Sequence, residues 1–119
     1  MKKKIEFREV PDNEMTYMGL ISDKIVSVIV DDIPIGIAYL SEGISKGYER
    51  NTAYIEWIEF LYAFRSKHML RPVMDKLCAE YGELIFESSN ELHTKYKAIG
   101  AIETGYDKVR EMHSWRYVA

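Results

Sequence analysis

The sequence has few of the features that identify a secreted or membrane protein. Its single cysteine, Cys78, excludes an internal disulfide and favours a reducing, cytoplasmic location. No stretch approaches the ~20 consecutive apolar residues that a membrane helix needs. The basic start MKKK is followed by Glu6, Arg8 and Glu9 rather than by the apolar segment of a secretory signal. We therefore expect a protein that is neither secreted nor inserted in a membrane.

An excess of positive charge is also absent. The 119 residues carry 16 basic and 19 acidic side chains, a formal net charge of −3, which argues against nucleic-acid binding. Repeats, linkers and low-complexity segments are absent too, and 47% of the residues are hydrophobic. This composition is typical of an ordinary globular protein, so we expect one domain over residues 1–119.

Apolar alternation and β-branched residues predict a sheet. We expect strands over residues 3–10, 24–30, 35–40, 52–64, 83–89, 101–108 and 111–118. Asp31 and Asp32 supply a hairpin turn, and Gly36 within a strand indicates a bulge or a close backbone approach. Residues 11–20 are compatible with a short helix or a loop, and residues 41–51 with a loop.

Two segments have helical spacing. Apolar residues every fourth position predict a helix over residues 69–81, with Pro72 in its first turn and Gly82 as a left-handed cap. A second helix is expected over residues 88–100, where Ser88 and Glu91 match a capping box. The resulting order is β, ββ, β, α, β, α, ββ. It predicts an α/β (α+β) fold whose mixed sheet has six to seven strands and two main helices.

This order and four local segments resemble the GNAT superfamily of acyl-CoA-dependent N-acetyltransferases. The segments are VDDIPIGIAYL (30–40), YIEWIEF (54–60), RSKHMLRPVMDKL (65–77) and NELHTKYKAIGA (90–101). The IGA ending of the last segment resembles GNAT-like proteins encoded by bacteriophages. Two departures stand out. Only residues 11–23 separate the first two strands, so the first two family helices are reduced or absent. His68 and Leu70 occupy the positions of two family glycines.

The resemblance implies a binding site for acetyl-CoA in a gap where the fourth and fifth strands splay apart. The pantetheine arm would lie along Phe60, Leu61 and Tyr62, and Asn90 belongs to the signature of the family's fourth helix. The diphosphate would meet amides at a helix start and basic side chains. The implied residues are Arg65, Lys67, His68, Met69, Leu70 and Arg71. Since cations at a helix N-terminus are unfavourable by themselves, a bound anion would explain them.

The resemblance also implies two catalytic residues. Tyr96 would protonate the departing thiolate, although it could equally pack inward with Leu92 and Ile99. Glu59 is the preferred base. Glu56 is an odd number of residues away on the same strand, so we expect the two carboxylates to face opposite sides. Either glutamate could instead be a solvated or ion-paired carboxylate.

The other distinctive residues favour structural roles. Cys78 is expected to be a buried, inert thiol, and Trp57 and Trp115 to pack in the core or at an edge. His93 and His113 look isolated, without ligand spacing, so no metal site is expected.

Two functions are compatible with these features. The first is an acetyl-CoA-dependent N-acetyltransferase acting on a small-molecule amine or a protein amino group. The alternative is a non-catalytic GNAT-fold protein that has lost the cofactor and binds a partner protein or a second copy of itself. A sheet edge or a tyrosine-rich face would then be the working surface.

Overall fold

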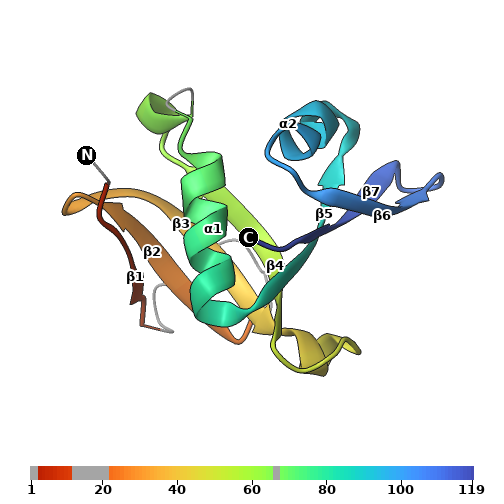
Figure 1. Cartoon of the computed structure of the whole chain (residues 1–119), viewed down its shortest axis with the longest axis horizontal. Helices are drawn as coiled ribbons and strands as arrows, with labels where there is room; N and C mark the ends of the chain where they lie inside the picture. The colour runs from red at the N-terminus through yellow and green to blue at the C-terminus, as the bar shows by residue number, and fades with distance from the viewer. Residues whose placement is uncertain (1–2, 12–21, 66–67) are drawn as a thin grey trace.

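The computed structural model describes residues 3–11, 22–65 and 68–119, whose strands form one seven-stranded sheet (Figure 1). The strand order is β1-β2-β3-β4-β5-β7-β6, and every pair is antiparallel except β4–β5. The strands are β1 (Ile5–Glu9), β2 (Lys24–Val30), β3 (Ile33–Glu42), β4 (Thr52–Phe60), β5 (Glu83–Ser89), β6 (Ile102–Asp107) and β7 (Met112–Tyr117). The mixed sheet predicted from the sequence is therefore confirmed.

Two α-helices accompany the sheet, as predicted. They are α1 (Leu70–Tyr81) and α2 (His93–Ala98), and three 3-10 turns complete the order: η3 (Gly43–Lys46), η4 (Tyr62–Phe64) and η5 (Asn90–Leu92). The strand expected to reach residue 64 ends at Phe60, because η4 begins two residues later. The segment over residues 12–20, for which helix and loop were both open, lies outside the described residues. No helix of the described residues is long and apolar enough to cross a membrane.

The core lies between one face of the sheet and both helices. Helix α1 crosses this face (Figure 1), and Tyr96 of α2 joins the same buried cluster as Trp115 of β7. The inward residues of α1 follow its helical period: Leu70, Val73, Met74 and Leu77. The other face of the sheet carries Ile25, Ile29, Tyr39 and Ile85, which are also buried.

The hairpin between β2 and β3 forms as the sequence predicts. Asp31 and Asp32 have φ values of 50° and 69°, the left-handed conformation that two-residue hairpin turns require. The register shifts next to Gly36, where Ile35 is the extra residue, and a Cβ on Gly36 would lie 2.5 Å from the carbonyl oxygen of Glu59. Both expectations for Gly36, a bulge and a close backbone approach, are therefore confirmed.

A second bulge lies in β4 at Glu56. Tyr39 pairs with Trp57 but Leu40 pairs with Ile55, which leaves Glu56 as the extra residue. The bulge changes the alternation of side chains, so Glu56 and Glu59 lie on the same face. Glu56 accepts a hydrogen bond from Ser41 of β3, and Glu59 accepts one from Trp57. Trp57 pairs with Tyr39, which lies two positions from Ser41 and therefore on the same face of β3. The expectation that the two carboxylates face opposite sides is wrong because it assumed a regular strand.

The helix ends depart from two predictions. Ser88 is not a cap: it lies buried in β5, and its Oγ accepts a hydrogen bond of 2.8 Å from the indole nitrogen of Trp115. Gly82 ends α1 as expected, but with φ 98° and ψ −172° rather than in the left-handed helical conformation. A Cβ at Gly82 would lie 2.0 Å from the carbonyl oxygen of Asn51. This close approach explains why a glycine is needed there.

Candidate functional site

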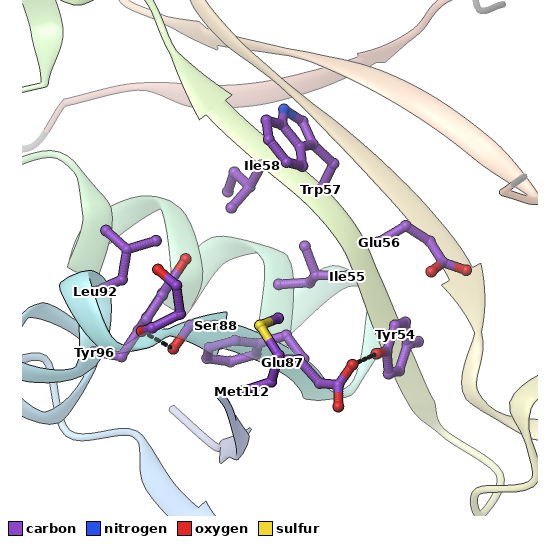
Figure 2. A pocket seen from close by; sticks show the side chains of 12 residues that line it. Tyr54, Ile55, Glu56, Trp57, Ile58, Glu87, Ser88, Leu92, Tyr96 and Met112 are labelled. Atoms are coloured by element: carbon purple, nitrogen blue, oxygen red, sulfur yellow. Dashed lines mark hydrogen bonds between the residues drawn. The ribbon is translucent and has the colours of Figure 1, made fainter. Parts of the chain in front are cut away.

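The strands β4 and β5 separate halfway along their length. They pair only over Thr52–Ile55 and Glu83–Phe86, although β4 continues to Phe60 and β5 to Ser89. The separation begins at the bulge at Glu56, which turns the second half of β4 away. Beyond Ile55, the edge of β4 that faces β5 therefore lacks a pairing strand among the described residues. Side chains fill the space beside this edge only partly (Figure 2).

Three adjoining cavities form a continuous groove that begins in this gap. The first, of about 510 Å³, shares Trp57, Ile58, Leu92 and Tyr96 with the second, of about 340 Å³. The second shares Arg65, Leu70 and Lys95 with the third, of about 640 Å³, which opens at the N-terminus of α1. We call these three cavities together the groove. It runs from the strand gap, past Tyr96, to the start of a helix.

Tyr96 stands where the first two cavities meet. Its ring packs against Phe86 and Trp115, with centroids 4.7 and 6.1 Å away. Burial raises the pKa of Tyr96 to about 12, so its hydroxyl keeps its proton at neutral pH. No residue in the described part of the chain forms a hydrogen bond with this hydroxyl. The side chain therefore packs inward and also presents a proton donor to the groove.

The N-terminus of α1 forms one wall of the third cavity. The amides of Leu70 and Arg71 have no acceptor among the described residues, as expected for the first turn of a helix. The side chain of Leu70 is buried in the core, and His68 is exposed with a φ of 54°. His68 thus adopts the left-handed conformation that a glycine would adopt. Neither the side chain of Leu70 nor that of His68 fills the third cavity at the start of α1, which we call the corner.

Positive charge surrounds this corner. Arg65, His68, Arg71 and Lys95 line the third cavity, and no acidic residue does among the described residues that surround it. Lys95 was missed by the sequence reasoning, although it directly precedes Tyr96 within the recognised segment. The remaining basic candidate, Lys67, lies outside the described residues. An anion would find four cationic or titratable side chains and the positive end of a helix here.

Arg65 connects the groove to β4. Its Nε donates to the carbonyl oxygen of Phe60 at 2.9 Å, and its Nη2 lies 3.3 Å from Oε2 of Glu59. Glu59 also accepts from the indole nitrogen of Trp57 at 3.2 Å, and 42% of its side chain is exposed. Glu59 lines the second cavity and also the cavity beside Gly36. Glu56 borders the first cavity, where Lys46 neutralises it at 2.6 Å.

The other residues expected in the site are divided. Phe60 and Met69 line the groove, and Leu61 and Tyr62 line an adjoining cavity of about 300 Å³ beside Gly36, which shares Glu59, Phe60 and Arg65 with the second cavity. Asn90 is not among the residues that line the groove. Its Oδ1 lies 2.6 Å from Nε2 of His113, on the other side of η5. The structure thus gathers Tyr96, Glu59 and the residues of the α1 N-terminus, places Leu61 and Tyr62 in the adjoining cavity, and leaves Asn90 apart.

The architecture closely resembles that of solved acetyltransferases. A protein of Bacillus anthracis assigned as a streptothricin acetyltransferase, in complex with acetyl-CoA, superposes with a TM-score of 0.66 at 13% identity over 98% of both chains. An acetyltransferase of Bacillus subtilis in complex with CoA has a TM-score of 0.67 at 12% identity over 99% of both chains. The spermidine/spermine N-acetyltransferase of Vibrio cholerae has a TM-score of 0.63 at 13% identity, covering 95% of this chain and 92% of that one.

At these identities the likeness establishes the fold. No protein-family model and no curated protein sequence matches the chain. The sheet order, the splayed strands and the superpositions together show that the chain has the GNAT acetyltransferase fold.

Proposed function

We propose that the chain is an N-acetyltransferase that uses acetyl-CoA to acetylate an amine, either on a small molecule or on a protein. The groove supports this proposal most directly, because it joins a gap between two strands to a cationic helix N-terminus. Two of the similar structures contain acetyl-CoA or CoA.

The groove suits the two ends of acetyl-CoA. The diphosphate would lie at the α1 N-terminus, where the amides of Leu70 and Arg71 and the cationic side chains of Arg71 and Lys95 favour negative charge. The pantetheine arm would follow the second cavity toward the gap, where the edge of β4 has backbone groups without a strand partner. Arg65 would shape this passage, since it already holds the carbonyl oxygen of Phe60.

The protein's part in the chemistry would be proton transfer and orientation. Acetyl-CoA supplies an acetyl group activated as a thioester. Glu59 would accept the proton of the incoming ammonium, so that the free amine can form the new C–N bond as the C–S bond breaks. Tyr96 would give its phenolic proton to the departing sulfur. With a pKa of about 12 the phenol is protonated at neutral pH, so the proton is available when the sulfur leaves.

The open corner at α1 favours the enzyme over the non-catalytic alternative. A chain that had lost the cofactor could fill the corner with the side chains that replace the family glycines. Instead, Leu70 is buried in the core and His68 is exposed beside a cavity of about 640 Å³.

Turnover of acetyl-CoA in the presence of a panel of amines and lysine peptides tests the proposal. We expect free thiol to appear with at least one amine, and Tyr96→Phe to lower kcat by about 10²-fold or more. Tyr81→Phe is the matched control, because Tyr81 is the last residue of α1 and lines none of the three cavities of the groove. A thiol release that Tyr96→Phe leaves unchanged would remove the assigned acid. The complete absence of turnover would contradict the reaction class.

A further inference from the structure

Two histidines and a glutamate meet on the surface beside α2. Glu103 of β6 places Oε1 2.9 Å from Nε2 of His93 and Oε2 2.5 Å from Nδ1 of His113. The imidazole rings of His93 and His113 lie 4.4 Å apart. The expectation that the two histidines are isolated is therefore wrong. They are 20 positions apart in the sequence, and only the β6–β7 hairpin and the start of α2 bring them together.

The contact with Asn90 determines which ring nitrogen of His113 carries the hydrogen and which is the acceptor that faces Glu103. Oδ1 of Asn90 lies 2.6 Å from Nε2 of His113, and an amide oxygen can only accept a hydrogen bond. Nε2 therefore carries the hydrogen, and Nδ1 of a neutral His113 presents a lone pair to Oε2 of Glu103. Two acceptors 2.5 Å apart repel each other, and a proton or a bound cation that both atoms contact would remove this repulsion.

The three side chains match the ligand set of a metal site. One ligand atom from each of His93, Glu103 and His113 can be chosen so that all three lie within 4.8 Å of one another. Ligands at the usual zinc distances of about 2.0–2.1 Å are about 3.4 Å apart in a tetrahedral site, so shifts of about 1 Å would admit the ion. A ligating histidine commonly donates its other N–H to an oxygen, as His113 does to Asn90.

We propose that His93, Glu103 and His113 form a zinc site, with water at the fourth position. Two imidazoles and one carboxylate suit Zn²⁺ better than the hard cations Mg²⁺ and Ca²⁺, which require mostly oxygen ligands. The side chains of His93, Glu103 and His113 are 29%, 36% and 13% exposed, so an ion can enter from solvent. This proposal does not depend on the proposed acetyltransferase activity.

The ion would hold α2 against the C-terminal hairpin. His93 is the first residue of α2, Glu103 lies in β6 and His113 in β7. Tyr96 lies one helical turn after His93, and the rings of both residues contact Trp115, at 6.1 and 5.2 Å. Zinc would thus stabilise the helix that carries Tyr96 without touching the groove.

Zinc titration of the untagged, EDTA-treated protein tests the site. We expect one Zn²⁺ per chain, a Kd of about 1 μM or lower, and a rise in Tm of several degrees. Co²⁺ in place of Zn²⁺ should give the visible absorption of a four-coordinate site. It should also quench the fluorescence of Trp115, measured in a Trp57→Phe background, because the indole lies 5.2 Å from His93.

Four variants locate the ion. His113→Ala and Glu103→Gln should raise Kd by about 100-fold or more, and Asn90→Ala by about 10-fold through the lost orientation of His113. His68→Ala is the matched control, because it removes the chain's third histidine and should leave Kd unchanged. Since Glu103 is exposed, Glu103→Gln should fold even if His113→Ala does not. Absence of zinc binding by the wild-type chain at about 1 mM, or equal Kd values for wild type and Glu103→Gln, would overturn the site.

Discussion

The ring of Tyr96 packs against the ring of Phe86, with centroids 4.7 Å apart and planes tilted by 53°. This contact fixes the phenol at the junction of the first two cavities of the groove. The aromatic body is therefore part of the core, as its place in the apolar stripe of α2 suggested, while the hydroxyl serves the proposed chemistry. A Tyr96→Phe substitution separates the two roles, because phenylalanine keeps the packing and loses only the proton donor.

Ionisation of Tyr96 should occur at unusually high pH. Burial raises its pKa from 10.0 to about 12, so the fold favours the neutral phenol. The resulting stability is fully present below pH 10 and is lost as pH rises toward 12, because the unfolded chain ionises first. The tyrosinate absorbance of wild type minus that of Tyr96→Phe should titrate near 12. A difference that titrates near 10 would show that the phenol is not buried as described.

Loss of the Ser88 hydroxyl should destabilise the chain. Ser88→Ala leaves the buried indole N–H of Trp115 without its acceptor, which costs about 1–3 kcal/mol. Ser89→Ala is the matched control, because no hydrogen bond of its hydroxyl is present among the described residues, and should change the free energy of unfolding by less than about 0.5 kcal/mol. Urea denaturation measures both values. Equal effects of the two substitutions would contradict the buried hydrogen bond.

Substitutions at His68 should follow its left-handed backbone. With φ at 54°, His68→Gly relieves strain but makes the unfolded chain more flexible, so we expect a net change within about 0.5 kcal/mol. A β-branched residue is much less compatible with this conformation, and His68→Val should be about 1–2 kcal/mol less stable than His68→Gly. Chemical denaturation of the two variants side by side decides the matter. A His68→Val chain as stable as His68→Gly would show that the loop does not hold a positive φ.

A side chain at Gly36 should disturb β4. The Cβ of Gly36→Ala would lie 2.5 Å from the carbonyl oxygen of Glu59 and 2.6 Å from Cδ1 of Phe60, so we expect a loss of about 1–3 kcal/mol. Gly105→Ala provides the comparison in another strand, since its Cβ would meet nothing closer than 4.0 Å. That change should be neutral or slightly stabilising. Thermal unfolding of both variants is sufficient, and comparable Tm values would contradict the close approach.

Most secondary structure could be predicted because its signals are local. Alternation in β1, the Asp31–Asp32 turn and the apolar stripe of α1 each depend on neighbouring residues. The bulge at Glu56 could not be predicted in this way, because it arises from the pairing of β4 with β3. It reverses the side on which every later residue of β4 points. This single irregularity explains the wrong placement of Glu56 relative to Glu59.

Site residues that are neighbours in the sequence could be predicted, whereas those that come together only in the folded chain could not. The basic cluster from Arg65 to Arg71 was visible as a run, whereas Lys95 joins it only across the third cavity. Ser88 matched a helix cap in sequence, but the indole of Trp115, 27 residues later, holds its hydroxyl. The same limitation hid the meeting of His93 and His113 on Glu103.

Calorimetric titration with acetyl-CoA tests the central claim most directly, namely that the groove holds this cofactor with its diphosphate at the α1 N-terminus. The account predicts saturable one-site binding with a Kd of about 1–100 μM, weakened at least about 10-fold by Lys95→Glu. Lys108→Glu makes the same charge change on the exposed β6–β7 turn and should leave Kd unchanged. No binding heat at millimolar acetyl-CoA, or equal weakening by the two substitutions, would contradict it.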